Sequence, residues 1–243
     1  MNMRLGLIGY GRMGREVERI ALHRGHEVKA VFDSENLPSR DRVDGVLDAL
    51  IDFSLPAAVW PNVQRLEGSP VPIIIGTTGW QQHLEALALM VESKGMTVFH
   101  AANFSIGMNL FLRITRHAAA LMNRFDDYDA FIHETHHSGK QDSPSGTAHV
   151  LGELLLKELD RKNTMSIDPV QGLIPDDVLH IASSRAGNVP GTHVVSFDSE
   201  ADTLELTHRA RNRSGFASGS IRAAEWVKGR KGIFTMDDML GAL

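Results

Sequence analysis

The residues best suited to carry chemistry form one stretch near the middle of the chain, His133-Glu134-Thr135-His136-His137-Ser138-Gly139-Lys140, followed by Pro144-Ser145-Gly146-Thr147. A histidine can deliver a proton near neutral pH, and Lys140 adds a fixed positive charge close to it. Ser143 or Ser145 can cap a helix that follows, which would leave the N–H groups of Gly146 and Thr147 free to bind an anion. The stretch therefore predicts a carboxylate-binding site next to a proton donor.

A metal site is one alternative for the same stretch, and a plain solvated loop is the other. Against a metal, the chain has no Cys, and His133 and His137 lie at the end of a strand rather than at paired positions on a helix. Lys140 would also repel a cation. Against a plain loop, the histidines and the lysine come directly before the Pro-Ser-Gly-Thr turn, which is the arrangement of a site. We expect an anion site and no metal.

A second motif, Gly9-Tyr10-Gly11-Arg12-Met13-Gly14, has the G-x-G-x-x-G pattern of nucleotide-binding loops. The pattern is weak alone, but here it follows an apolar strand and opens a helix, so a pyrophosphate can lie at the helix N-terminus. Asp33 ends the second strand and is placed to bind the ribose hydroxyls of NAD. Arg12 is a cation that could still accept the extra phosphate of NADP.

Further cofactor contacts are predicted directly after the third, fourth and fifth strands. Ligands of an open α/β sheet bind beyond the carboxyl ends of its strands, so these turns should line one crevice. The candidate residues are Phe53, Gly76, Thr77, Thr78, Ala101, Asn103 and Phe104. Each of these patterns, taken alone, is also typical of an ordinary turn.

Two polar segments each keep two interpretations. Arg185 and His193 flank a Gly-rich stretch that either lines a polar pocket or forms an exposed hairpin turn. The basic run of Arg209, Arg211 and Arg213 is either a solvated interdomain segment or faces an anionic ligand.

The elements that must position these residues change in character near residue 104. Before it, strands alternate with helices, which predicts βαβ units and a parallel sheet. After it, helices are expected at 106–123 and 148–159, and strands at 128–134, 179–184, 193–197 and 203–208. The last three strands are not separated by helices, which is typical of an α+β domain. The chain then ends in a helix at 216–228 and a short one at 236–240, capped by Thr235.

The sequence thus predicts an α/β protein with two domains. Residues 1–103 and 212–243 form a Rossmann-type parallel-sheet domain that binds a dinucleotide. Residues 104–211 form an inserted α+β domain for substrate binding and oligomerisation. Its open mixed sheet would leave apolar surface uncovered in a monomer, which favours an oligomer.

The composition excludes several classes of protein. The 243 residues include 25 Lys and Arg against 30 Asp and Glu, a net charge of −5 that argues against general binding of nucleic acid. The absence of Cys excludes disulfides and fits a reducing cytoplasm. The longest uncharged stretch, 95–112, contains His100, Asn103 and Asn109, so no membrane span is expected.

Taken in order along the chain, these motifs resemble the dihydrodipicolinate reductase family. The resemblance rests on Gly9 to Gly14, Asp52-Phe53-Ser54, Gly76-Thr77-Thr78-Gly79, Ala101 to Ser105, the Glu134 to Ala148 stretch, Arg185-Ala186-Gly187, Gly191-Thr192-His193, Glu205 to His208 and Gly232-Ile233-Phe234. It implies an NAD(P)H-dependent oxidoreductase of diaminopimelate and lysine biosynthesis. Such an enzyme reduces 4-hydroxy-tetrahydrodipicolinate, through its dehydrated cyclic imine, to tetrahydrodipicolinate.

The resemblance also implies roles for single residues. His136 takes the position of the proton donor, and Lys140 that of the catalytic lysine that pairs with a substrate carboxylate. His137, Gly146 and Thr147 match positions that grip the small dicarboxylate substrate. The family further implies that the second domain closes over the cofactor and builds a homotetramer through its open sheet.

The chain departs from the family after Asp33. The segment 34–48 is short, and Ser34 stands where a basic residue is frequent, so we expect NADH to be favoured, with NADPH as an alternative. Another NAD(P)-dependent dehydrogenase, acting on a small amino or hydroxy dicarboxylic acid, would use the same first domain. A non-enzymatic nucleotide sensor would keep the glycine motif but would not need His136 and Lys140.

Overall fold

The computed structural model of the chain, which describes residues 2–167 and 169–241, divides into two compact units. The first unit consists of Met1–Ile106 and Arg213–Leu243, and the second of Gly107–Asn212. The division therefore falls at 106/107 and 212/213, where the sequence predicted 103/104 and 211/212. The first junction lies later because the turn after the fifth strand, including Phe104, packs in the core of the first unit.

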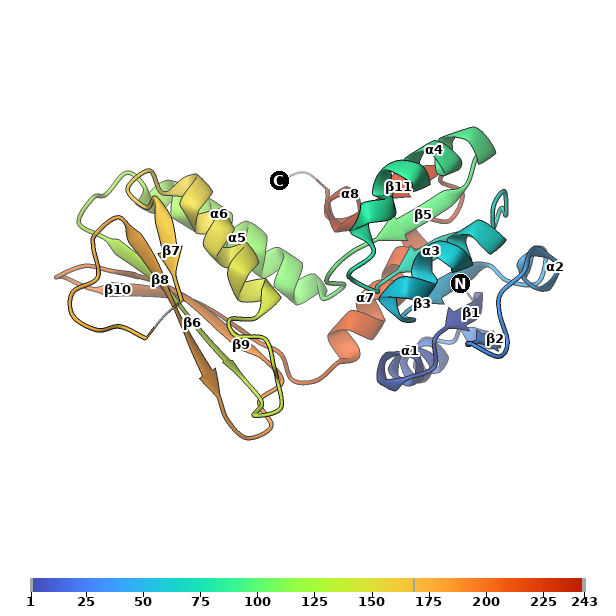
Figure 1. Ribbon diagram of the computed structural model, residues 1–243, viewed down its shortest axis with the longest axis horizontal. Coiled ribbons are helices and arrows are strands. Elements are labelled where there is room, and N and C mark those ends of the chain that lie inside the picture. The colour runs from blue at the N-terminus through green and yellow to red at the C-terminus, as the bar shows by residue number, and fades with distance from the viewer. Residues whose placement is uncertain (1, 168, 242–243) are drawn as a thin grey trace. The chain divides into compact units, whose positions relative to one another are not determined.

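The first unit is built on a six-stranded parallel sheet in the order β11-β5-β4-β3-β1-β2 (Figure 1). The strands are β1 (Arg4–Ile8), β2 (Glu27–Phe32), β3 (Ala49–Asp52), β4 (Ile73–Ile75), β5 (Thr97–His100) and β11 (Gly232–Phe234). The central strands β3 and β4 are buried throughout because helices cover both faces of the sheet. This confirms the predicted Rossmann-type architecture.

Two cores lie on the two faces of this sheet. Helices α1 (Arg12–His23), α7 (Ser214–Trp226) and α8 (Met236–Leu240) contribute to one core. Helices α2 (Arg40–Val43), α3 (Pro56–Arg65) and α4 (Leu84–Lys94), with the 3₁₀ turn η1 (Gln81–His83) before α4, lie at the other. Thr235 caps α8 as predicted, in a capping box with Asp238.

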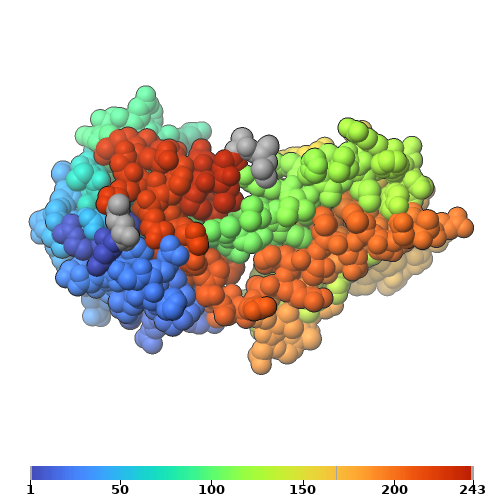
Figure 2. Space-filling view, turned by 180° about the vertical axis from the view of Figure 1, so that it is seen from behind, coloured from blue at the N-terminus to red at the C-terminus, as the bar shows by residue number. Residues whose placement is uncertain are grey.

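The C-terminal segment returns to complete the first unit. Helix α7 packs against α1, and Glu225 on α7 pairs with Arg24 and with the buried His26 near the start of the chain, at 2.8 and 2.9 Å. Figure 2 shows the red surface of this segment against the blue surface of the N-terminal residues. Contacts across two hundred positions in sequence therefore hold this domain together.

The second unit is a five-stranded mixed sheet in the order β10-β9-β6-β8-β7. The strands are β6 (Asp129–His136), β7 (Thr164–Ser166), β8 (Val178–Arg185), β9 (Thr192–Asp198) and β10 (Thr203–Arg209). β8 runs parallel to β6 and β7, whereas β9 runs antiparallel to β6 and β10. Helices α5 (Ile106–Met122) and α6 (Gly146–Glu158) supply the other half of its core (Figure 1).

The sequence of helix α5 places Leu110, Ile114, Ala118 and Leu121 at helical spacing, but the structure buries a different stripe. Leu110 and Ile114 are 41% and 55% exposed, whereas Met108, Phe111, Thr115 and Ala119 are buried. Both stripes are apolar, so periodicity alone cannot choose between them, and the sheet packs against the one that carries Phe111. Among the described residues, no helix is both long enough and apolar enough to cross a membrane.

Candidate active site

The glycine motif forms the turn between β1 and α1, and each glycine has its own reason to be there. Gly9 has a φ of +83°, and a Cβ there would lie 2.8 Å from the Phe53 carbonyl oxygen. A Cβ on Gly14 would lie 2.3 Å from the Gly9 carbonyl oxygen. Gly11 is the N-cap of α1, and a Cβ there would meet no atom within 4 Å. Gly9 and Gly14 close the turn, while Gly11 faces the open space where a phosphate would lie.

The other predicted residues of this loop lie at its rim. Arg12 is exposed and Met13 half-buried, while the Tyr10 hydroxyl contacts Glu18. The Oδ1 atom of Asp33 accepts the backbone N–H groups of Glu35 and Asn36, both at 2.9 Å. This fixes the carboxylate at the carboxyl end of β2, where a ribose would be bound.

The turns after β3 and β4 interlock. A Cβ on Gly76 would lie 2.1 Å from the Phe53 ring, so a side chain at this position would force the ring to move. The buried Asp52 accepts the Ser54 backbone N–H at 2.8 Å and so shapes the turn that carries Phe53. Thr77 donates its hydroxyl to the Ser54 carbonyl at 3.0 Å. Thr78 is exposed beside it.

The turn after β5 completes this edge of the sheet. Ala101 donates its N–H to the Ile75 carbonyl at 3.2 Å, and Asn103 accepts the Ser105 N–H at 2.9 Å. The Phe104 ring is buried and meets the Phe53 ring edge-on, with centroids 6.2 Å apart. The three turns thus lie together at the carboxyl edge of the sheet.

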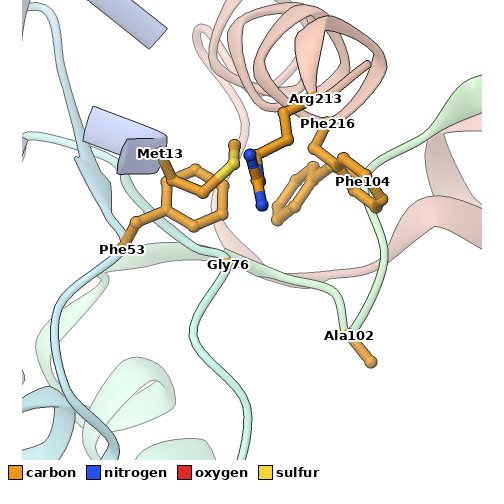
Figure 3. A pocket seen from close by; sticks show the side chains of 7 residues that line it. All are labelled: Met13, Phe53, Gly76, Ala102, Phe104, Arg213 and Phe216. Atoms are coloured by element: carbon orange, nitrogen blue, oxygen red, sulfur yellow. The ribbon is translucent and has the colours of Figure 1, made fainter. Parts of the chain in front are cut away.

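A cavity of about 230 Å³ opens at this edge (Figure 3). It is lined by Met13, Phe53, Gly76, Ala102, Phe104, Arg213 and Phe216. Figure 3 shows the Arg213 side chain entering the cavity from the start of α7, between Met13 and the two phenylalanines Phe104 and Phe216. The cavity is otherwise mostly apolar, so the guanidinium is its main polar group.

The cavity is lined both by residues predicted to contact a cofactor and by residues to which sequence reasoning gave no role. Met13, Phe53, Gly76 and Phe104 were predicted as cofactor contacts, whereas Ala102, Arg213 and Phe216 were not. Arg213 belongs to the basic run whose role was left open. Arg213 and Phe216 lie more than a hundred positions after the other lining residues, so only the return of α7 brings them here.

The second unit positions the His and Lys stretch between β6 and α6. Along β6 the buried positions alternate with more exposed ones, and this alternation puts Glu134 and His136 on the side that faces the core. His133 falls on the opposite side, with Nε2 3.1 Å from the Ser184 hydroxyl. Ser145, rather than Ser143, is the N-cap of α6, and its hydroxyl accepts the Ala148 N–H at 3.3 Å.

Lys140 and the start of α6 bind one carboxylate from this chain. The Lys140 Nζ lies 2.7 and 2.9 Å from the two carboxylate oxygens of Asp142, and the N–H of Gly146 also hydrogen-bonds to that carboxylate. The Lys140 hydrogen bond lowers the pKa of Asp142 below its usual value. Gly146 is exposed, Thr147 half-buried, and a Cβ on Gly146 would meet no atom within 4 Å. The predicted anion site is thus able to bind a carboxylate.

Next to these residues lies a group of ionisable side chains, of which Glu134, His136 and His193 are buried and Arg185 is half-buried. The Arg185 Nη2 donates to Glu134 Oε1 at 2.7 Å, and Glu134 Oε2 contacts His136 Nδ1. The His193 ring stands edge-on to His136, with centroids 5.2 Å apart. Burial lowers the pKa of His193 to about 4, and the nearby His136 adds to this. Arg185 and His193, whose roles were open, therefore contact the two residues at the end of β6.

Glu134, His136 and His193 are also residue types that bind metals, and their ligand atoms lie within 4.8 Å of one another. The surroundings disfavour a cation, because Arg185 already occupies one oxygen of Glu134 and Lys140 adds a second positive charge. We therefore interpret Glu134 and His136 as an ionised carboxylate paired with an imidazole rather than as metal ligands.

His137 lies half-buried next to this group, on the turn that leads to Lys140. Its carbonyl accepts the Lys140 N–H at 3.1 Å, and its ring lies close to Gly139. The structure therefore brings His136, His137, Lys140, Gly146 and Thr147 into one region of the second unit.

Comparison with known proteins gives the family. Two family models match, described as dihydrodipicolinate reductase N-terminus over residues 3–104 and C-terminus over residues 107–240. A protein of Christiangramia forsetii named 4-hydroxy-tetrahydrodipicolinate reductase is 36% identical over 241 residues, covering 99% of each chain. A relative of the same name from Methanoregula boonei is 34% identical, covering 95% of this chain and 92% of its own.

A solved structure agrees in fold. It is the dipicolinate-bound dihydrodipicolinate reductase from Paenisporosarcina sp. TG-14, which matches with a TM-score of 0.77 at 23% identity. The match covers 99% of this chain and 100% of that one. The chain belongs to the dihydrodipicolinate reductase family.

Proposed function

We propose that this chain reduces 4-hydroxy-tetrahydrodipicolinate, after loss of water to a cyclic imine, to tetrahydrodipicolinate with NADH or NADPH. This is a step of diaminopimelate and lysine biosynthesis, and it is the activity for which the curated relatives are named. The observation that carries the proposal is the carboxylate held by Lys140 and Gly146 a few residues from His136. A dicarboxylate substrate presents the same group to the same partners.

The first unit would hold the cofactor through the glycine motif, Asp33 and the cavity lined by Phe53 and Phe104. A nicotinamide bound there supplies a hydride. Asp33 favours NADH, because its carboxylate can accept ribose hydroxyls and repels a 2′-phosphate, and Ser34 adds no positive charge to offset it.

The second unit would hold the substrate and supply the proton. Lys140 and the N–H groups of Gly146 and Thr147 bind a ring carboxylate, with His137 beside them. Reduction adds one hydride and one proton across a ring double bond, so a proton donor must stand next to the bound ring. His136 is the general acid in this proposal. Lys140 also stabilises the negative charge that develops on the ring during hydride transfer.

The proposal extends to the setting of the reaction. The substrate and cofactor are small metabolites of the cytoplasm, where the absence of Cys carries no disadvantage. We place the enzyme there as a homotetramer.

A coupled assay tests the function. Purified protein is supplied with freshly made dihydrodipicolinate synthase product, and oxidation of NADH and NADPH is followed separately. We expect oxidation that depends on the synthase product, that pyridine-2,6-dicarboxylate inhibits, and that has the higher kcat/KM with NADH. Absence of oxidation with either cofactor would overturn the proposal. Oxidation with another amino or hydroxy acid instead would indicate a different dehydrogenase.

A further inference from the structure

A fully buried carboxylate stands behind the proposed proton donor, and the proposed mechanism does not use it. Glu134 has a side chain that is 0% exposed, on the face of β6 that also carries Ala130 and Ile132. Transferring a carboxylate into such a core is unfavourable unless specific partners compensate for the lost hydration. The partners that stabilise the Glu134 carboxylate therefore indicate its role.

The two oxygens of Glu134 have different partners. Oε1 accepts from the Arg185 guanidinium at 2.7 Å and from the Ser145 backbone N–H at 3.2 Å. Oε2 contacts the Nδ1 atom of His136. Arg185 and Ser145 therefore fix the orientation of the carboxylate, and the orientation presents Oε2 to the imidazole.

Glu134 is ionised at neutral pH. Burial acts to raise its pKa, but hydrogen bonds from Arg185 and Ser183, and the charge of His136, outweigh burial and hold the pKa below its usual value. An ionised carboxylate can only accept hydrogen bonds, so the nitrogen that faces it must carry the hydrogen. On His136 that nitrogen is Nδ1.

We propose that Glu134 is a positioning residue that fixes the tautomer of His136, so that Nε2 is the nitrogen that exchanges a proton with the ligand. The catalytic role of this tautomer rests on the proposed function. The tautomer of His136 in the ligand-free enzyme does not depend on it. When His136 takes up a second proton, Glu134 also stabilises the imidazolium from behind. The arrangement leaves the proton to be delivered on Nε2 alone.

The other groups around His136 agree with this assignment. Gly191 has a φ of +153°, and a Cβ there would lie 2.9 Å from Nε2, so glycine keeps the space beside this nitrogen clear. His193 stays neutral near pH 7, because its pKa is about 4. Lys140 and Arg185 are the cations nearby, and both oppose a positive charge on His136. Glu134 is the one negative charge among these neighbours.

The first test reads the tautomer without turnover. Nitrogen-15 NMR of the full-length protein assigns which ring nitrogen of His136 carries hydrogen near pH 8. We expect hydrogen on Nδ1 in the unsubstituted protein. Hydrogen on Nε2 in the neutral ring would overturn the proposal, whatever the enzyme does in an assay.

The second test changes the partner. In Glu134→Gln the carboxamide oxygen stays on Arg185, which can only donate, so the amide NH₂ faces Nδ1 and should reverse the tautomer. With the synthase product, kcat should fall about 10- to 100-fold while the Kd for NADH and the KM change less than about threefold. The pH at which the rate begins to fall on the alkaline side should shift down, because the imidazolium loses its stabilising charge.

Two more variants make the result decisive. Glu153→Gln removes an exposed carboxylate on α6 of the same unit and should leave all these readouts unchanged. Glu134→Asp keeps the charge and should restore the Nδ1–H tautomer and part of kcat. A Glu134→Gln protein that folds and keeps both its tautomer and its pH profile would overturn the proposal. Inactivity of the unsubstituted protein would refute the proposed function and leave the NMR result standing.

Discussion

At the scale of single residues, the carboxylate of Asp142 occupies the partners that we assign to the substrate. Lys140 holds it at 2.7 and 2.9 Å, and Gly146 hydrogen-bonds to it. A dicarboxylate that binds here must displace it, and an ionised Asp142 then remains as a repelling neighbour. We predict that Asp142→Asn lowers the Kd for pyridine-2,6-dicarboxylate about three- to tenfold, a modest effect because the pair is partly exposed. Isothermal titration calorimetry measures it.

Asp126→Asn is the matched control for Asp142→Asn, since Asp126 is an exposed carboxylate of the same unit. It should leave the Kd unchanged. A weaker dicarboxylate complex in Asp142→Asn would show that Asp142 supports Lys140 in its active position rather than competing for it.

Cofactor preference is also decided by a few atoms. Asp33 keeps its Oδ1 on two backbone N–H groups, so Asp33→Asn can retain the turn while removing the charge. We predict that the ratio of kcat/KM for NADPH to that for NADH rises about tenfold or more, because repulsion of the 2′-phosphate is lost. Steady-state rates with both cofactors measure the ratio. An unchanged ratio would mean that Asp33 does not face the ribose.

Sequence reasoning reached the site residues that lie in compact motifs and missed those that the fold brings in. His136, Lys140 and Gly146 fall within one short stretch whose chemistry is evident from residue types. Glu134 is in the same stretch, but its burial depends on which face of β6 meets the core. Arg213 reaches the cavity only because α7 returns to the first unit, and no local pattern carries that information.

At the scale of elements, most helices and strands were predicted, including the short strands β3, β4 and β5, which lie in apolar stretches of the sequence. The elements that were not predicted are β7 and β11, with three residues each, and α2, with four. Helix α5, whose Leu110 and Ile114 are exposed, shows a second limit of prediction from sequence. A helix that is apolar on two sides gives a clear helix prediction but does not reveal which side is buried.

Helix α7 can approach the turn after β5 only because it carries a glycine at the contact. A Cβ on Gly219 would lie 1.7 Å from the Phe104 carbonyl oxygen, a clash with backbone that no side-chain rotation relieves. We predict that Gly219→Ala lowers the free energy of unfolding by about 2 kcal/mol or more and weakens NADH binding, because Phe104 lines the cavity. Urea unfolding and NADH titration measure the two effects.

Arg222→Ala provides the comparison for Gly219→Ala, because Arg222 is exposed on the same helix. Its free energy of unfolding should change by less than about 0.5 kcal/mol. Equal effects of the two substitutions would mean that the contact with Phe104 does not limit the approach of α7.

The pairing of β6 with β9 buries His193, which is neutral near pH 7. The pKa of His193 is lowered from 6.5 to about 4, first by burial and then by His136. Between these values the unfolded chain binds a proton that the folded chain does not, so stability falls as pH falls from 6.5 to 4. Each pKa unit corresponds to about 1.4 kcal/mol. We predict that His193→Gln makes this pH dependence shallower but does not abolish it, because burial also lowers the pKa of His136 and His208.

Urea unfolding at several pH values between 4 and 7 measures the slope for His193→Gln. His149→Gln, at an exposed position on α6, should keep the slope of the unsubstituted protein. A slope unchanged in His193→Gln would mean that His193 is protonated in the folded state or is not buried there.

At the scale of the whole molecule, the sheet of the second unit has one face covered by helices and one face that carries an exposed aromatic side chain. Helices α5 and α6 pack on the face that carries Ile132. The opposite face carries Phe131, which is 38% exposed, and His133, whose neighbours across β8 and β9 are Ala182 and Val194. Aromatic side chains are enriched at protein–protein interfaces, so this face is a candidate for association.

The tetramer proposed above predicts that this face is the interface between subunits. Phe131→Asp places a charge at the centre of the face, where burying it without a partner would cost several kcal/mol, so the variant should form smaller particles than four chains. Light scattering after size exclusion measures the mass.

Phe125→Asp is the control for Phe131→Asp. It makes the same chemical change at a 55% exposed site outside the strands and should leave the mass unchanged. Because the cavity that we propose for the cofactor lies wholly in the first unit, NADH should bind Phe131→Asp as it binds the unsubstituted protein. A Phe131→Asp protein that keeps the mass of the unsubstituted one would place the interface elsewhere.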